Sequence, residues 1–402
     1  MPDIIFPKLC DDDICTGCSA CVNICAFGAL TIGTNGEGFY RPKLDTNKCI
    51  GCQKCLKSCP VISKPNLVNK NGSCSKVWAA WHKNASIRKN SSSGGAFSAL
   101  ASMVLRNGGL VVGAAYNEHL EVCHIIVDDE SELYRLRQSK YVQSNMGLCM
   151  RDVRKLLNKG KMVMFVGTPC QCAGMRKVIG KDNENLLLVD FICHGVPSAT
   201  MLNKWIQWLR NTVGMITNIE FRNKCKGWYD AVRVVTLQSG KKKILKGKND
   251  SYWVGFNNNN NNLQFSCYDC QFLGLPRLSD ITIADFWGIG HHISFGHKTE
   301  IENGVSMVIA NHSRAVEFVE KCDDLEKFER TIEEVTKRNQ AALHSCVMPK
   351  SRKTFYTDLE KLPFNEFIDN YLIPDNKTKL VKIWREYLPS WLIRSVRTLK
   401  QK

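Results

Sequence analysis

A cysteine motif that occurs twice near the start of the chain constrains the fold more than any other feature. The spacing C-x2-C-x2-C-x3-C is found at 15–25 and again at 49–59. Its eight cysteines are Cys15, Cys18, Cys21, Cys25, Cys49, Cys52, Cys55 and Cys59. In such runs, three closely spaced thiolates bind one cubane and the fourth thiolate reaches a second cubane. Residues 1–62 are therefore predicted to hold two 4Fe–4S clusters.

The same rule predicts how the eight cysteines are shared. One cluster is expected to bind Cys15, Cys18, Cys21 and Cys59, and the other to bind Cys49, Cys52, Cys55 and Cys25. Zinc sites usually combine two spaced CxxC pairs, which these runs do not provide. Residues 1–62 resemble bacterial-type two-cluster ferredoxins along their whole length.

The composition supports a metal-binding protein. The chain has 402 residues and 20 cysteines, and in a reducing compartment so many cysteines indicate metal ligands rather than disulfides. No run of 18 apolar residues and no signal-peptide pattern occur, so we expect a cytoplasmic protein. The formal net charge of +17 would fall to about +11 with three clusters of about −2 each. Nucleic-acid binding is not expected, because no reading motif accompanies the charge.

The rest of the chain is predicted to be a mixed α/β domain, so that the whole is of α/β and α+β class. A polar linker is expected at 63–76, followed by α/β regions at 77–165 and 166–349 and a basic helical tail at 350–402. We expect the tail to pack on the core; peripheral contact with a membrane surface is the alternative.

Apolar periodicity places the elements of this second part. Helices are expected at 95–107, 150–159 and 198–209, strands at 109–116, 161–166 and 186–192, and a hairpin at 231–247. Because apolar strands alternate with helices, the sheet should be partly parallel. The six asparagines at 257–262 are interpreted as a low-complexity loop without a function.

Six segments between 91 and 290 together resemble the family of coenzyme F420 hydrogenase/dehydrogenase beta subunits. They are SSSGGAFSALA (91–101), SKYVQS (139–144), GTPCQ (167–171), DFICHGVPS (190–198), FRNKCKGW (221–228) and CYDCQFLGLPRLSDITIADFWGIG (267–290). The resemblance implies an iron–sulfur flavoprotein that moves electrons between clusters, FAD and a hydride carrier. The chain departs from the family pattern at Ala284, where Gly is usual, and it contains no hydrogenase or formate dehydrogenase catalytic unit.

The same segments can be interpreted physically. The loop before the helix at 95–107 offers free backbone N–H groups, which favour an anion such as a flavin pyrophosphate. Thr168 and Cys193 follow apolar strands, and ligands bind at that edge of an open α/β sheet. Candidate cofactor-binding residues are Ser92, Ser93, Gly94, Gly95, Lys140, Tyr141, Thr168, Pro169 and Asp285. His194 and Lys140 are the candidate catalytic residues, for proton transfer and for pairing with the flavin or its phosphate.

Cys267-x2-Cys270 is a ligand pair that needs two further thiolates to complete a cluster. Cys170 and Cys193 are the expected partners, because both follow strands at the same sheet edge. Cys172 and Cys225 are the reserves, and a structural zinc at the 267–270 pair is the alternative to a third 4Fe–4S cluster.

Two functions remain open from the sequence. In the first, the chain is an oxidoreductase component that exchanges hydride with a coenzyme F420-type or other small-molecule carrier and single electrons with a redox partner protein or ferredoxin. In the second, it is a non-catalytic electron-transfer component of a larger redox complex. A flavin decides between them, because only a flavin converts single electrons into hydride here.

Overall fold

A computed structural model describes residues 4–64 and 76–373. Most of the expected linker, and the part of the basic tail after residue 373, lie outside the described residues, so the membrane-surface alternative for the tail stays a prediction. In the described part of the chain, no helix is both long and apolar enough to cross a membrane.

The first domain repeats its backbone as it repeats its sequence. Its elements are α1 (Ala20–Ile24), β1 (Leu30–Thr34), β2 (Tyr40–Leu44) and α2 (Lys54–Ser58), and β1 pairs antiparallel with β2. Gly17 and Gly51 have φ of +66° and +71°, and Ser19 and Gln53, which precede the two helices, have φ of +64° and +59°. The two cysteine loops therefore turn in the same way, and glycine provides the left-handed turn before each second cysteine.

An eight-stranded sheet forms the centre of the second part, in the order β13-β3-β12-β11-β7-β6-β4-β5. Its strands are β3 (Lys76–His82), β4 (Leu110–Tyr116), β5 (Val122–Val127), β6 (Val163–Gly167), β7 (Leu186–Phe191), β11 (Ile281–Asp285), β12 (Ser306–Ala310) and β13 (Leu325–Arg330). The four central strands β11, β7, β6 and β4 are parallel, and the outer strands are antiparallel. The expected partly parallel sheet is confirmed.

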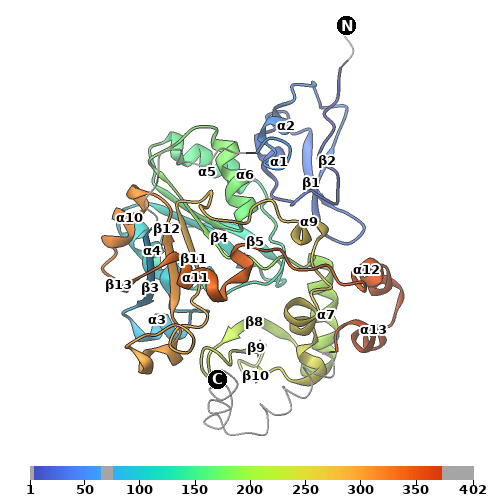
Figure 1. Cartoon of the computed structure of the whole chain (residues 1–402). Coiled ribbons are helices and arrows are strands. Elements are labelled where there is room, and N and C mark those ends of the chain that lie inside the picture. Colours follow the sequence, from blue (N-terminus) through green and yellow to red (C-terminus); the bar gives the residue numbers. More distant parts are fainter. Residues whose placement is uncertain (1–3, 65–75, 374–402) are drawn as a thin grey trace.

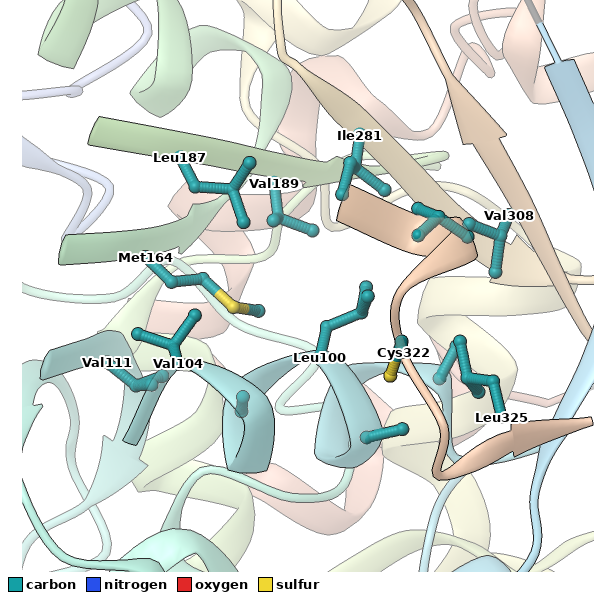
Figure 2. Close-up of a cluster of buried hydrophobic side chains, with 14 of the residues drawn as sticks. Leu100, Val104, Val111, Met164, Leu187, Val189, Ile281, Val308, Cys322 and Leu325 are labelled. Carbon is teal, nitrogen blue, oxygen red and sulfur yellow. The ribbon is translucent and has the colours of Figure 1, made fainter. Parts of the chain in front are cut away.

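Helices cover both faces of this sheet (Figure 1). On one face, α4 (Ala96–Arg106) and α10 (Ser313–Glu320) pack over the core that Figure 2 shows, where Leu100 lies among Met164, Val189 and Val308. On the other face, α5 (Cys149–Asn158) and α6 (Pro169–Ile179) enclose a second core around Phe165.

A second lobe completes the molecule. It contains α7 (Ala199–Val213), the antiparallel sheet of β8 (Ile216–Asn223), β9 (Val232–Leu237) and β10 (Lys242–Ile244), α12 (Arg352–Lys361) and α13 (Phe364–Tyr371). The short helices outside the first domain, which belong to different parts of the molecule, are α3 (Ala85–Lys89), α8 (Ser251–Trp253), α9 (Phe265–Tyr268) and α11 (Ile332–Arg338). The Ser198 side chain accepts the Met201 N–H at the start of α7, as an N-cap does.

The first domain is anchored to both other parts. Helices α1 and α2 lie against α6, as Figure 1 shows in blue and green. Phe39, just before β2, is fully buried in the core of the second lobe and meets the Tyr356 ring at 5.4 Å. Arg352, which is also buried, donates to both carboxylate oxygens of Glu37. Such buried contacts fix the relative position of the domains.

The expected helices and strands are found within a few residues of their predicted bounds, and the asparagine tract is more buried at its end than at its start. Asn261 and Asn262 are buried, and Asn259 and Asn261 each donate to the Tyr371 backbone oxygen. The end of the tract thus packs against the last residue of α13, while Asn257 and Asn258 are exposed. Asparagine suits this place because its amide supplies hydrogen bonds to buried backbone.

Candidate cluster and cofactor site

Interactions between thiols show which cysteines of the first domain are neighbours. Burial raises the pKa of the Cys21 thiol, and the nearby Cys15 and Cys59 add to the effect, so the last cysteine of the second run lies with the first run. Cys55 has the same relationship to Cys49 and Cys52. None of the described cysteines forms a disulfide. The structure does not test ligation itself, which stays a prediction.

A cavity of about 530 Å³ lies beyond this domain, at the carboxyl ends of β6, β7 and β11. Thr168 and Cys193 follow the first two strands, and Asp285 ends the third; all three line the cavity. Thr168 caps α6 by accepting the Gln171 N–H, and Pro169 occupies the first helical position. The cavity therefore lies at the sheet edge that was expected to bind ligands.

At one end of the cavity the structure brings together Cys170, Cys193, Cys267 and Cys270. Burial raises the pKa of all four thiols, and Cys193 interacts with each of the other three. No three His, Cys, Asp or Glu side chains of the described residues are close enough to hold a single metal ion. Four thiols that are too far apart for a single metal ion suit a 4Fe–4S cubane, which is larger than one ion. A zinc ion at the Cys267–Cys270 pair stays the alternative.

The reserve cysteines are placed elsewhere. Cys172 is buried, and its thiol is directed at the Val189 backbone oxygen, 3.5 Å away. Cys225 is exposed and does not line the cavity.

The first domain forms part of the cavity wall. Thr16 lines the cavity, and the Cys18 thiol lies near enough to Cys170 for their charges to interact. Gln143 holds this wall in place, because its side chain accepts the Tyr40 N–H at 2.7 Å. The first cluster loop and the four-cysteine group are thus neighbours.

The opposite end is the loop 91–95, which precedes α4 and is rigidly held. Lys224 donates from one ammonium group to the backbone oxygens of Arg88, Ser93 and Asn303, at 2.6, 2.6 and 2.7 Å. A Cβ atom at Gly94 would lie 2.5 Å from the Ala80 oxygen, so only glycine fits there. Gly95 has φ of +92° and directs the following N–H groups along the helix axis.

Ser92 and Ser93 are used in fixing this loop. Ser92 Oγ accepts the Ser139 N–H at 2.9 Å, and Ser93 Oγ donates to the Val305 oxygen at 3.0 Å. The loop therefore offers mainly its backbone N–H groups and the helix dipole to a ligand, the arrangement that binds phosphate.

The charges of the cavity lining favour an anion. Arg137, Lys140, Arg222 and Arg338 line it, and Asp285 is the one carboxylate among its lining residues. Arg222 is 8% exposed, and its Nε and Nη2 atoms have no hydrogen-bond partner within the described structure. Nη2 lies 3.4 Å from Asp285 Oδ2, while Asp285 Oδ1 accepts the Trp228 Nε1–H at 2.6 Å. A buried guanidinium with free donors is suited to a negatively charged ligand.

Lys140, expected to contact the cofactor, is directed differently. Its ammonium donates to the backbone oxygens of Arg135 and Arg137 at 2.9 and 2.6 Å, and burial lowers its pKa to about 7. Lys140 and the neighbouring Tyr141 both line the cavity, and the Tyr141 ring packs edge-on against Trp253 at 5.0 Å. Lys140 thus shapes the loop at 135–140, and its proposed catalytic role stays a prediction.

His194 lies beside the four-cysteine group. Its Nε2 is 2.7 Å from Asn260 Oδ1, and its Nδ1 is 3.3 Å from the Cys346 sulfur. Both nitrogens therefore have protein partners, which fits a positioned ring; the predicted proton transfer is not tested by this geometry.

Comparisons with known proteins match three regions. Residues 77–149 match the N-terminal model of the coenzyme F420 hydrogenase/dehydrogenase beta subunit, and residues 160–335 match the corresponding C-terminal model. Together the two models cover well over half of the chain. The chain belongs to the family of coenzyme F420 hydrogenase/dehydrogenase beta subunits. A 4Fe-4S dicluster domain model matches residues 14–62 and supports the two ferredoxin clusters.

Individual relatives of this member of the F420 hydrogenase/dehydrogenase family are distant. One component of the F(420)H(2) dehydrogenase of Methanosarcina mazei is 26% identical over 237 residues, which are 55% of this chain and 66% of the relative. Coenzyme F420-dependent sulfite reductase of Methanocaldococcus jannaschii is 27% identical over 177 residues, 42% of this chain and 26% of that relative. The matches thus span less than two thirds of either relative. The F420-reducing [NiFe] hydrogenase complex from Methanosarcina barkeri contains a chain with 18% identity and a TM-score of 0.46, covering 69% of this chain and 90% of that one.

Sequence patterns do not identify several residues of the site in this F420 hydrogenase/dehydrogenase family member. Arg222 and Lys224 lie within the segment FRNKCKGW, which indicates the family but not their roles. In the sequence, Thr16 is only a residue between the predicted ligands Cys15 and Cys18, and nothing there indicates that it lines the cavity. Cys10 lies outside either motif, yet its sulfur hydrogen-bonds with Cys15 and Cys59. Its position five residues before the first ligand is the one signal that could have drawn attention to it.

Proposed function

We propose that this chain is the flavin-containing electron-transfer component of an oxidoreductase, which exchanges single electrons through 4Fe–4S clusters and hydride with a coenzyme F420-type carrier. One observation carries the proposal: a single cavity is lined both by four cluster-type cysteines and by the loop 91–95 before α4, together with basic side chains of which Arg222 is buried. A flavin that fits between them would convert one-electron into two-electron transfer.

The residues of the cavity fit FAD. The backbone N–H groups at the start of α4 would hold its pyrophosphate, and Arg222 has free donors for an anionic oxygen. Tyr141 and Phe256 supply aromatic surface, with ring centroids 4.8 Å apart. The rigid loop held by Lys224 would bind the cofactor without first being ordered.

The proposed electron route follows the chain of neighbouring cysteines. Cys52 is exposed, so the cluster of the second run faces a redox partner protein or ferredoxin. Cys18 in the first run interacts with Cys170, which joins the first domain to the third cluster at the cavity. Three clusters would then connect the molecular surface with the flavin.

A coenzyme F420-type molecule is proposed as the hydride carrier because of the family to which the chain belongs and the names of its relatives. Both relatives described above carry coenzyme F420 in their names. The basic lining of the cavity fits any phosphate-bearing carrier, so NADH and NADPH are the alternatives to test against it.

The test begins with protein purified anaerobically, from which flavin is released by acid and iron is counted. About one FAD and about twelve iron atoms per chain are expected, on the stoichiometry of three cubanes. Titration with reduced F420, NADH, NADPH and reduced ferredoxin then identifies the donor by bleaching of the visible absorbance. Intact clusters without any flavin would overturn the proposal in favour of a non-catalytic electron-transfer component.

A further inference from the structure

A chain of hydrogen-bonded side chains leads away from the cofactor cavity. Gln171 and Ser144 line the cavity, and Gln171 Nε2 donates to Ser144 Oγ at 3.0 Å. Ser144 Oγ is 3.0 Å from His124 Nδ1, and His124 Nε2 is 3.2 Å from the Val166 oxygen. All three side chains are buried.

The chain ends at the Val166 oxygen, and its last side chain, His124, also lines a second pocket of about 320 Å³ that is more open to solvent. Its lining includes Cys123 on β5, Asn145, Leu148 and Asp152 on α5. His124 lines both this outer pocket and the cofactor cavity. The imidazole therefore separates the two spaces.

The hydrogen-bond partners determine the state of the ring. A backbone oxygen only accepts, so His124 Nε2 carries a proton and donates it to Val166. Nδ1 is then the acceptor, and the Ser144 hydroxyl donates to it. The ring is stacked on Phe165 at 5.7 Å in an apolar core, where a polar chain is costly unless its members are paired.

The proposed reaction requires protons at this place. A hydride is one proton and two electrons, and the electrons that pass through clusters bring no proton. Each hydride formed from cluster electrons therefore takes one proton from solvent, and each hydride split into cluster electrons returns one. The cavity must exchange this proton while its cofactor stays covered.

Resting on the proposed function, we propose that Ser144 and His124 form the proton path between the cofactor cavity and the outer pocket. For a proton leaving the cavity, Ser144 Oγ accepts it and passes its own hydroxyl proton to His124 Nδ1. The Nε2 proton then leaves its bond to the Val166 oxygen and passes to water where His124 lines the outer pocket, and return of a proton from Nδ1 to Nε2 through water restores the resting tautomer. A proton entering the cavity takes the reverse route, so each transfer forms one bond to hydrogen and breaks another.

The surroundings of His124 keep the ring from retaining the proton. Burial lowers its pKa to about 4, with a smaller contribution from Lys140. Cys123 on its own strand and Cys149 and Asp152 on α5 are the other titratable groups of the outer pocket, and Asp152 can collect protons at its mouth. A ring that is protonated only transiently is suited to relay rather than storage.

The test uses anaerobic, cluster- and flavin-loaded protein into which electrons are introduced by light, so that no carrier is needed. Bleaching of the clusters and of the flavin is followed separately in H₂O and D₂O. His124→Gln and Ser144→Ala should each slow the proton-coupled flavin bleaching by about 10²-fold, the usual effect of removing a positioned proton-transfer group. Cluster bleaching should be unchanged, because it takes up no proton. Phe165→Leu, which removes only the ring stacked on His124, is the packing control and should behave as wild type.

Four outcomes decide the matter. Wild-type flavin bleaching that does not slow in D₂O overturns the proton path, even if both variants fail to fold. Variants that bleach their flavin at the wild-type rate overturn it as well, whereas slowing in both variants but not in the control supports it. A protein that binds no flavin removes the proposed function itself, which is a different result.

Discussion

Gly174 on α6 lies directly against Cys18: a Cβ atom at position 174 would be 3.1 Å from the Cys18 sulfur and 3.3 Å from Ala20 Cβ. The close approach of helix and cluster loop therefore depends on the missing side chain. Gly174→Val should force the first domain away from α6, at a cost of about 1–3 kcal/mol for overpacking. Electron transfer from the first domain to the four-cysteine group should slow, as measured by delayed flavin bleaching after rapid reduction of the surface cluster. Gly36→Ala is the control, because nothing lies within 4 Å of a Cβ atom there. Equal rates in both variants would show that this contact does not control electron transfer.

Lys224→Met should loosen the loop 91–95. The substitution removes the donor that three backbone oxygens share; the Arg88 oxygen keeps the Ser91 N–H, whereas the part-buried Ser93 oxygen loses its donor, and a buried unpaired acceptor costs about 1–3 kcal/mol. We expect lower thermal stability and loss of flavin during gel filtration, with full iron content. Lys226→Met, two residues away and exposed, should retain the flavin. Full flavin retention in the Lys224 variant would contradict the role assigned to this loop.

Replacement of Cys267 and Cys270 by Ser should remove about four iron atoms per chain, the content of one cubane. Metal analysis that also measures zinc checks the alternative directly, since a structural zinc would disappear instead of iron. Cys172→Ala is the matched control, because that buried thiol faces the Val189 oxygen and should be dispensable for metal. If the iron and zinc contents of the double variant both equal those of the wild type, Cys267 and Cys270 bind neither metal.

His124 should make the stability of the protein depend on pH. Its pKa is lowered from 6.5 to about 4 in the folded state, so the unfolded chain binds more protons between these values. Stability is then complete above pH 6.5 and falls as the pH drops toward 4, by about 2 kcal/mol between about pH 7 and about pH 5. The difference in free energy of unfolding between wild type and His124→Gln, measured anaerobically over this range, isolates the effect. His119→Gln, at an exposed histidine, should follow wild type. A difference that does not change with pH would refute the assignment.

The sequence predicted best what depends on spacing along the chain. The cysteine runs fix which thiols share a loop, and parallel strands bring Thr168, Cys193 and Asp285 to one edge because their carboxyl ends point the same way. The four cysteines around the cavity followed from that argument, and the structure places them together.

What the sequence did not predict depends on side-chain direction after distant segments have packed. Lys224 meets the Arg88 oxygen from 136 residues away, and nothing in the local pattern distinguishes it from a solvated lysine. Lys140 shows the same limit, because its ammonium donates to backbone oxygens of its own loop, a direction that the sequence does not indicate. The packing of the asparagine tract was not predicted either, because the Asn259 and Asn261 amides donate to the Tyr371 oxygen, 112 and 110 residues away.

The two cysteine loops share one backbone conformation but have unequal freedom to change. Around Gly17, a Cβ atom would collide with Gln143 and the Tyr40 backbone, whereas around Gly51 it would meet only the N-terminal segment at Ile4 and Ile5. A side chain at position 17 therefore disturbs the interior of the protein, whereas one at position 51 meets the N-terminal segment. Of the two copies of the cysteine loop, the first is thus fixed by contacts inside the protein, and the second lies under the N-terminal segment. Changes at exposed positions of the second loop can therefore alter which electron donor docks, while the first loop and the cavity stay as they are.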